Sequence, residues 1–370
     1  MPIDENNQEF KLLLKTSDGD EILKNHDTVL VKFGPKRNGI VTSWLNGGYS
    51  KELSAVFNHQ LSQENIDKYG DGGILDFLKD LSADFYNDLN LRNDKISGLI
   101  TSADMDYFSI ASEKYRDIEV TAISTAGARV NAVSAGDKAS YYEINADYRY
   151  DLEEDASNNQ NPKKPGTINT IILINTKLDE SSLLLAEMIA VEAKAAALRD
   201  LMISSNYSNE IATGTGTDGI AIFSNLESEN FTDNVSKHAK IGELIANAVI
   251  DSVKESLAKL QWLTPVYQLN ALVRLDRFQY NLDDFYNVYL KIESEDEKRD
   301  FIVSLIEVSK NPELVANVSL IIHLLDQYRY GLLSKKTVLK VSNSILENQL
   351  DKEEWNSMKL LLEYIIKNQL

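Results

Sequence analysis

The stretch Thr167-Ile168-Asn169-Thr170-Ile171-Ile172-Leu173-Ile174-Asn175 consists mostly of β-branched and aliphatic residues. A short apolar run of this kind is typical of a buried β-strand. An apolar segment with helical spacing, Leu183 to Leu201, follows it, and Gly219 to Ser224 is a second short apolar run. The sequence therefore predicts a strand, a long helix and another strand in this order.

The chain before this region is rich in predicted strands. Three short alternating runs, at residues 10–14, 28–33 and 39–43, are separated by the turn-forming segments Asp18-Gly19-Asp20 and Gly34-Pro35. Such runs between turn residues predict antiparallel strands.

Helices and further strands are predicted between residues 52 and 124. The apolar residues of 52–58 and 73–89 have helical spacing, whereas 96–102 and 120–124 predict two strands with a short helix between them. Because strands and helices do not alternate regularly, we expect an α+β fold, with a mixed β-sheet layered with helices, rather than a doubly wound parallel sheet.

The pattern changes at Trp262-Leu263-Thr264-Pro265. From there to Leu370 it is helical, and Asn311-Pro312 and Ser334 are predicted helix starts. We therefore expect an α+β domain over residues 1–262 and an all-helical domain over 263–370, which is also a candidate element for homo-oligomerisation. Residues 150–165 are polar and without periodicity, which predicts a mobile surface loop.

The composition argues against several classes of function. The net charge of -19 disfavours a nucleic-acid partner, because such binding needs clustered Lys and Arg. The absence of cysteine leaves water, a hydroxyl or a carboxylate as the nucleophile of any hydrolysis. No run approaches the roughly 18 apolar residues of a membrane span, and residues 1–6 do not resemble a signal peptide, so we expect a cytoplasmic protein without membrane contact.

Threonine and glycine alternate in a segment that we call the Gly-Thr loop. Its residues are Thr213, Gly214, Thr215, Gly216, Thr217 and Asp218. Glycine lets the chain bend tightly, and the exposed backbone N–H groups and three hydroxyls can hold an oxyanion or a polar ligand. The lysine of a phosphate-binding P-loop is missing, and a plain tight turn is the alternative interpretation.

Glu192 and His238 are candidates for acid–base chemistry. Glu192 shares a predicted helix stripe with Leu185 and Met188, so its carboxylate should be desolvated, although a structural ion pair is the alternative. His238 starts a helix predicted over 237–260, where the helix dipole favours a neutral imidazole that can accept a proton. The other three histidines lack such neighbours, and no metal-ligand spacing predicts a protein-held zinc.

Amide side chains and one carboxylate lie at the ends of predicted strands. They are Asn46, followed by Gly47 and Gly48, and then Asp104, Asn131 and Asn169. Each alone is a turn signal. Together they suit a ligand edged by many carboxamides, because Asn offers both a donor and an acceptor.

These segments, in this order, resemble the adenosylcobinamide amidohydrolase family from about Phe10 to Leu260. The matching segments are Asn46 to Gly48, Gly98 to Asp104, Thr125 to Gly127, Asn131-Ala132, Gly166 to Asn169, Glu192 to Asp200, Thr213 to Asp218, Lys237-His238 and Gly242 to Ile245. The chain departs from the family pattern at Trp44-Leu45, at Ala239, in the 150–165 loop and in the helical domain.

The resemblance implies hydrolysis of the amide that links aminopropanol to the corrin ring of adenosylcobinamide. The product, adenosylcobyric acid, would serve cobalamin salvage, with the corrinoid as substrate and no further cofactor or metal required. A non-catalytic corrinoid-binding protein is the alternative. A nucleotide-dependent enzyme is poorly supported, because no P-loop or Gly-x-Gly-x-x-Gly unit is present.

Two mechanisms are compatible with the candidate residues. In the first, His238 or Glu192 activates water, Asp218 orients the base, and the amides and hydroxyls of the Gly-Thr loop stabilise the oxyanion. In the second, a threonine of this loop is the nucleophile and forms an acyl-enzyme. The residues assigned to substrate binding are Asn46, Gly47, Gly48, Asp104, Asn131, Asn169, Lys194 and Thr213 to Thr217.

Overall fold

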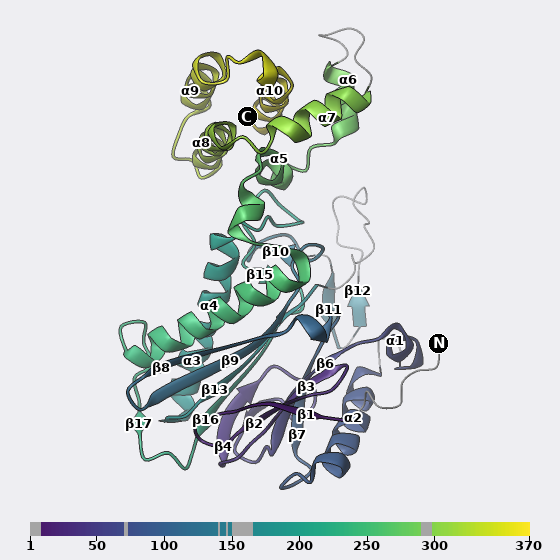
Figure 1. Cartoon of the computed structure of the whole chain (residues 1–370), viewed down its shortest axis with the longest axis vertical. Coiled ribbons are helices and arrows are strands. Elements are labelled where there is room, and N and C mark those ends of the chain that lie inside the picture. Colours follow the sequence, from purple (N-terminus) through teal and green to yellow (C-terminus); the bar gives the residue numbers. More distant parts are fainter. Residues whose placement is uncertain (1–8, 70–72, 140, 146, 150–165, 290–297) are drawn as a thin grey trace. The chain divides into compact units, whose positions relative to one another are not determined.

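The computed structural model describes residues 9–69, 73–139, 141–145, 147–149, 166–289 and 298–370 (Figure 1). The chain divides into two compact units. We call Met1–Ile203 with Ala212–Leu263 the α+β unit, and Ser204–Ile211 with Thr264–Leu370 the helical unit. The loop predicted over residues 150–165 lies outside the described residues. Within the described part of the chain, no helix has the length and apolar character needed to cross a membrane.

The first sheet of the α+β unit has five strands in the order β1-β2-β3-β6-β7. Neighbours pair antiparallel except β6 and β7, which are parallel. The strands are β1 (Lys11–Lys15), β2 (Glu21–Lys24), β3 (Thr28–Lys32), β6 (Ala55–Gln60) and β7 (Ile96–Thr101). The antiparallel strands predicted near the N-terminus are thereby confirmed for β1 and β3.

The second sheet has six strands in the order β5-β4-β16-β13-β9-β8. Only β13 and β16 pair in parallel, and α3 (Glu180–Asp200) connects them. The strands are β4 (Arg37–Val41), β5 (Gly48–Ser50), β8 (Ser109–Tyr115), β9 (Ile118–Ala126), β13 (Ile168–Ile174) and β16 (Gly219–Asn225). The predicted succession of strand, long helix and strand is confirmed.

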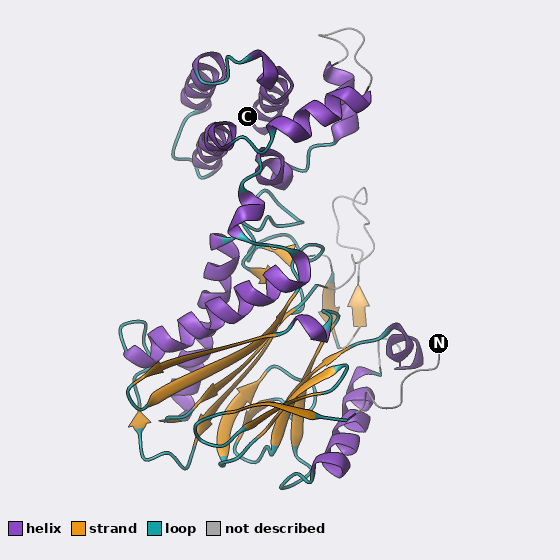
Figure 2. Cartoon of the chain, in the orientation of Figure 1, coloured by secondary structure: helices purple, strands orange, loops and turns teal. Residues whose placement is uncertain are grey.

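The two sheets and the helices form four layers, as Figure 2 shows. Helices α3 and α4 (Lys240–Gln261) pack on the six-stranded sheet, whose other face packs on the five-stranded sheet through residues such as Val31, Leu173 and Phe223. On the outer face of the five-stranded sheet, Phe57 packs with α2 (Ile74–Leu89). The alternation of strand side chains between two cores explains why the central strands, such as β3, β6 and β13, are buried on both faces. The α+β fold with mixed sheets is confirmed.

Shorter elements complete the α+β unit. They are α1 (Gln63–Tyr69), the 3-10 helix η2 (Met105–Tyr107), and the paired strands β10 (Ala132–Val133) with β15 (Gly214–Thr215), β11 (Tyr142–Ile144) with β12 (Asp147–Arg149), and β14 (Lys177–Leu178) with β17 (Phe231–Thr232).

The helix predicted over residues 52–58 is wrong, because β6 occupies Ala55–Gln60. Residues 55–59 are all buried, since β3 and β7 flank this strand and cores lie on both of its faces. A run that is buried on both faces has no alternation, so its spacing does not distinguish strand from helix. The sequence prediction also omits β8, which pairs with β9 along its whole length.

Gly98 permits the close contact between β6 and β7. It lies opposite Phe57, and a Cβ atom on residue 98 would lie 2.1 Å from Cζ of the Phe57 ring. We expect Gly98→Ala to lower the free energy of unfolding by about 1–3 kcal/mol, because ring and strand must shift. Urea denaturation measures the effect, and Phe57→Leu in the same background should recover part of the loss. An unchanged midpoint for Gly98→Ala would contradict this account.

A buried ion pair connects the turn between β1 and β2 to the six-stranded sheet. Arg37 forms a salt bridge with Asp20 and donates from Nη2 to Asp18 Oδ2 (2.6 Å) and from Nη1 to the Ile174 carbonyl (2.9 Å). Asp20 is 0% exposed and Arg37 is 1% exposed. Burial raises the pKa of Asp20, and the Arg37 guanidinium opposes this shift.

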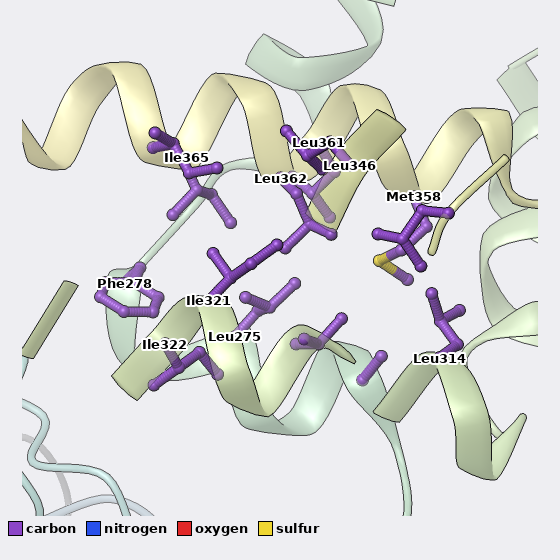
Figure 3. Packing of buried hydrophobic residues seen from close by; sticks show 14 of the residues in the cluster. Leu275, Phe278, Leu314, Ile321, Ile322, Leu346, Met358, Leu361, Leu362 and Ile365 are labelled. Atoms are coloured by element: carbon purple, nitrogen blue, oxygen red, sulfur yellow. The ribbon is translucent and has the colours of Figure 1, made fainter. Parts of the chain in front are cut away.

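The helical unit is built around one apolar core. Figure 3 shows Ile321 of α8 pointing toward Leu362 of α10 in this core. Asn311 and Ser334 cap α8 and α9, which confirms the predicted helix starts. The helices are α5 (Ala271–Leu275), α6 (Leu282–Tyr289), α7 (Lys298–Val308), α8 (Pro312–Arg329), α9 (Lys335–Asn348) and α10 (Asn356–Gln369), with short 3-10 turns at Pro265–Gln268, Asp276–Phe278 and Glu353–Trp355.

Ser204–Ile211 belongs to the helical unit although it lies between α3 and β15 in the sequence. Glu210 forms an ion pair with Arg329 (3.0 Å), and Asn209 Nδ2 donates to Gln369 Oε1 (2.7 Å). The sequence did not predict that this segment packs with the helical unit, because the residues that it contacts lie more than a hundred positions away in the chain.

Candidate active site

Most of the predicted site segments meet at one edge of the six-stranded sheet. The Gly-Thr loop leads into β16 and Gly166 leads into β13 at the same edge, because these strands are parallel. Strands β9 and β4 are antiparallel to them, so they end at this edge, at Ala126 and Val41. The edge thus brings together four segments that are distant in sequence.

The Asp218 carboxylate accepts hydrogen bonds from four donors. Oδ2 accepts from Lys194 Nζ (2.5 Å) and from the Thr215 amide (3.0 Å). Oδ1 accepts from the Thr215 hydroxyl (2.5 Å) and from the Ile168 amide (3.0 Å). A carboxylate has about four lone-pair sites, so these donors fill them. Asp218 therefore fixes α3, the start of β13 and the Gly-Thr loop to one another.

Lys194 reaches this carboxylate from α3, with 16% of its side chain exposed. Gly214 leaves the space that the pair needs, because a Cβ atom there would lie 2.4 Å from Asp218 Oδ2 and 2.9 Å from Lys194 Nζ. An ammonium group has three donors. Lys194 can therefore bond Asp218 and a further acceptor at the same time.

A second set of bonds joins the exposed part of the Gly-Thr loop to the start of β13. The Thr217 hydroxyl donates to the Gly166 carbonyl (3.2 Å) and lies 2.7 Å from the Thr167 hydroxyl. Asn131 Nδ2 donates to the same carbonyl (3.0 Å). Gly216 and Thr217 are exposed, so this part of the loop faces solvent.

The segment with Asn46, Gly47 and Gly48 begins at the same edge, because the Thr42 amide donates to the Ile220 carbonyl (2.9 Å). Asn46 adopts a φ of 48° and its Nδ2 donates to the Ile96 carbonyl (2.8 Å), which anchors the turn to β7. Asp104 lies on the turn that follows β7, is exposed, and accepts a hydrogen bond from the Asp106 amide (2.9 Å) at the start of η2.

Asn169, predicted to bind substrate, is buried below this edge of the sheet. Its side chain is buried, and Nδ2 donates to Asn58 Oδ1 and to the Ile100 carbonyl, both at 2.8 Å. Asn58 in turn donates to the Thr125 hydroxyl (2.8 Å). This network connects the two sheets beneath the site. Sequence reasoning missed Asn58, although a polar residue within an apolar run was the available signal.

Glu192 is not desolvated, contrary to the prediction. Its side chain is 51% exposed and forms an ion pair with Lys237. Positions two apart on a helix do not face each other, so Glu192 points away from the side of α3 on which Lys194 meets Asp218. The exposed side chains of Leu184, Met188 and Val191 show that this stripe of α3 is not covered.

His238 is also not where the sequence predicted it. It lies on an exposed turn two residues before α4 begins at Lys240. Lys240 packs over the ring of Tyr115 at the opposite edge of the sheet, whereas Gln261, at the other end of this 22-residue helix, bonds residues next to the site. His238 therefore lies at the end of α4 that is opposite to Gln261, and its neighbour Lys237 pairs with Glu192 on the exposed side of α3.

His59 is the buried histidine of β6. Burial lowers its pKa to about 4 from 6.5. The unfolded chain therefore binds the proton more tightly, so stability is complete above pH 6.5 and is lost as the pH falls toward 4, by up to about 3 kcal/mol. Urea denaturation at pH 7 and pH 4 measures this loss, which His59→Gln should reduce. The same pH dependence in His59→Gln would assign it to other groups.

Among the described residues, no group of three or more His, Asp and Glu side chains is arranged to hold a metal ion.

The α+β unit is similar in sequence to known proteins. A family model described as adenosylcobinamide amidohydrolase matches residues 13–265, which include the whole candidate site. An uncharacterized protein of Methanocaldococcus jannaschii is 32% identical over 243 residues, which are 65% of this chain and 89% of that protein. A Pyrococcus horikoshii protein of known structure matches with a TM-score of 0.30 and 12% identity, over 68% of this chain and 83% of that chain, which is too distant to support an argument.

Proposed function

Because the chain belongs to the adenosylcobinamide amidohydrolase family, and is thus an amide-hydrolysing enzyme, we propose that it cleaves aminopropanol from adenosylcobinamide. The corrinoid product is adenosylcobyric acid, which re-enters cobalamin synthesis as a salvaged intermediate. The observation that carries the proposal is the family match over residues 13–265, because it contains Lys194, the Gly-Thr loop and Asp218.

The geometry favours a threonine nucleophile over water activated by His238 or Glu192. The Thr215 hydroxyl donates to Asp218 Oδ1 at 2.5 Å, and Lys194 holds the other carboxylate oxygen. A hydroxyl bonded to a base that a third group orients is the arrangement of an activated nucleophile. We therefore assign the nucleophile to Thr215, the base to Asp218 and the orienting cation to Lys194.

The reaction then proceeds in two half-reactions. Thr215 Oγ1 attacks the amide carbonyl carbon and its proton moves to Asp218. Asp218 gives this proton to the amide nitrogen, the C–N bond breaks, and aminopropanol leaves an ester on Thr215. Water attacks the ester and loses a proton to Asp218, which returns it to Thr215 as the ester C–O bond breaks. These steps use only side chains of the chain and water.

Negative charge develops on the carbonyl oxygen in both half-reactions. Lys194 lies beside Thr215 and has donors beyond the one that it gives to Asp218, so we assign it the stabilisation of this oxygen. We assign contacts with the carboxamides of the corrin ring to Asn46, Asp104 and Asn131.

The test is to incubate the full chain with adenosylcobinamide, without added nucleotide or metal, and to follow aminopropanol and the corrinoid by mass spectrometry. Equal amounts of aminopropanol and adenosylcobyric acid are expected. A corrinoid that binds but keeps its mass would instead indicate the non-catalytic corrinoid binder. If the corrinoid neither binds nor changes, the substrate assignment is wrong.

The nucleophile is tested separately by acid-quenched single turnovers. A corrinoid ester on the peptide that contains Thr215 is expected. If the wild type shows no such adduct and Thr215→Val still hydrolyses the substrate, direct attack by water is favoured.

A further inference from the structure

Trp262 lies at the end of α4, and 78% of its surface is exposed. Two other apolar side chains that are partly exposed, Tyr107 (40%) and Val130 (39%), belong to segments bonded to the same end of this helix. We call these three residues the Trp262 rim. Tryptophan and tyrosine are favoured at binding surfaces because they combine a large apolar area with little conformational freedom.

Hydrogen bonds hold Val130 next to the end of α4. Gln261 Oε1 accepts from the amides of Ala128 (2.8 Å) and Arg129 (3.1 Å). Arg129 Nη2 donates back to the Gln261 carbonyl (2.8 Å). Residues 128–130 are therefore fixed against the turn of helix that Trp262 follows.

Ser256 holds the segment of Tyr107 in a similar way. Its hydroxyl donates to the Tyr107 carbonyl (2.9 Å) and accepts from the Ala126 amide (2.9 Å). Ser256 lies little more than one helical turn before Gln261. The segments of Tyr107 and Val130 thus meet at one end of α4.

The backbone of Trp262 is itself held in place. Its φ of 57° lies in the left-handed region that non-glycine residues rarely adopt. Its amide donates to the carbonyls of Ala258 and Leu257, which closes the end of the helix. The backbone that carries this side chain is therefore fixed by the end of the helix.

The rim is continuous with the active site. Asn131, the next residue after Val130, donates to the Gly166 carbonyl, and Thr217 of the Gly-Thr loop donates to the same oxygen. The Gly127 amide donates to the Thr167 carbonyl (3.0 Å), which binds the same segment to the start of β13. A ligand larger than an amide group that reaches Thr215 would therefore extend over this segment.

We propose that Trp262 binds the corrin ring of the substrate while its side-chain amide occupies the active site. This inference rests on the proposed function. A corrin is a broad ring with apolar faces and carboxamides at its edge, so its face suits the Trp262 rim.

The experiment compares Trp262→Ala, Trp262→Phe and the matched control Phe231→Ala in the full chain. Phe231 is 58% exposed and belongs to β17, whose partner β14 follows the opposite end of β13. Trp262→Ala is expected to raise KM and the corrinoid Kd about tenfold with little change in kcat, since an aromatic side chain that the ligand covers is a typical binding hot spot. Trp262→Phe should retain most of the affinity, and Phe231→Ala should retain all of it.

The binding measurement separates this inference from the proposed function. A Kd of Trp262→Ala within about twofold of the wild-type value overturns the inference even if hydrolysis is normal. A wild type that binds the corrinoid without hydrolysing it contradicts the proposed function. In that case a tenfold higher Kd of Trp262→Ala would still support corrin binding by Trp262. A wild type that does not bind adenosylcobinamide contradicts both.

Discussion

Asp218→Asn is expected to lower kcat for adenosylcobinamide hydrolysis by about a hundredfold or more. An amide cannot take the proton of the Thr215 hydroxyl, which donates to Asp218 at 2.5 Å. It also removes the negative charge that faces Lys194, so the ammonium loses its countercharge. Steady-state release of aminopropanol measures the effect.

Glu192→Gln makes the same carboxylate-to-amide change on an exposed side chain. We expect its kcat to stay within about twofold of the wild-type value, because exposed ion pairs contribute little. His238→Ala should behave similarly. A hundredfold lower kcat in either of these variants, together with a nearly normal kcat for Asp218→Asn, would contradict the threonine mechanism. It would instead favour water activated by the residue at position 192 or 238.

Arg37→Met is expected to lower the free energy of unfolding by about 3–5 kcal/mol, because it leaves a buried carboxylate without its countercharge. Asp20 is 0% exposed, and Arg37 bonds it through both Nε (3.1 Å) and Nη2. Urea denaturation followed by circular dichroism measures the loss. The transition of the α+β unit is the one to compare, since two units need not unfold together.

Two variants test the physical origin of that loss. Asp20→Asn in the Arg37→Met background should recover part of it, because the unpaired charge is removed as well. Lys95→Met breaks the ion pair between Lys95 and Glu52, whose two side chains are each about half exposed or more. This change should lower the free energy of unfolding by less than about 1 kcal/mol. Equal losses for Arg37→Met and Lys95→Met would show that burial of the pair is not decisive.

The helices that were predicted correctly have their apolar residues on one face or begin at a clear capping residue. α2 was predicted over 73–89 and occupies Ile74–Leu89, and the caps Asn311 and Ser334 were read from local chemistry. β6 was missed because it is buried on both faces. Local spacing reports which residues share a face, and it fails where every face is covered.

The error at Glu192 has a simple physical cause. A helical stripe shows that Leu185, Met188 and Glu192 lie on one side of α3, but not whether another element covers that side. In the folded chain this side of α3 is exposed to solvent, so the Glu192 carboxylate remains hydrated. Lys194, two residues further along α3, instead points to Asp218.

The sequence by itself determined the β13–α3–β16 succession, the Gly-Thr loop and the family, because apolar spacing, glycine and the order of short segments are local or linear properties. Only the tertiary structure decided that the Gly-Thr loop and Asn131 meet at the Gly166 carbonyl, where β13 begins. It also decided that Arg37 pairs with Asp20 and that Ser204–Ile211 joins the helical unit. The physical reason is that strand order and strand direction in a mixed sheet follow from pairing between distant segments, which no local pattern records.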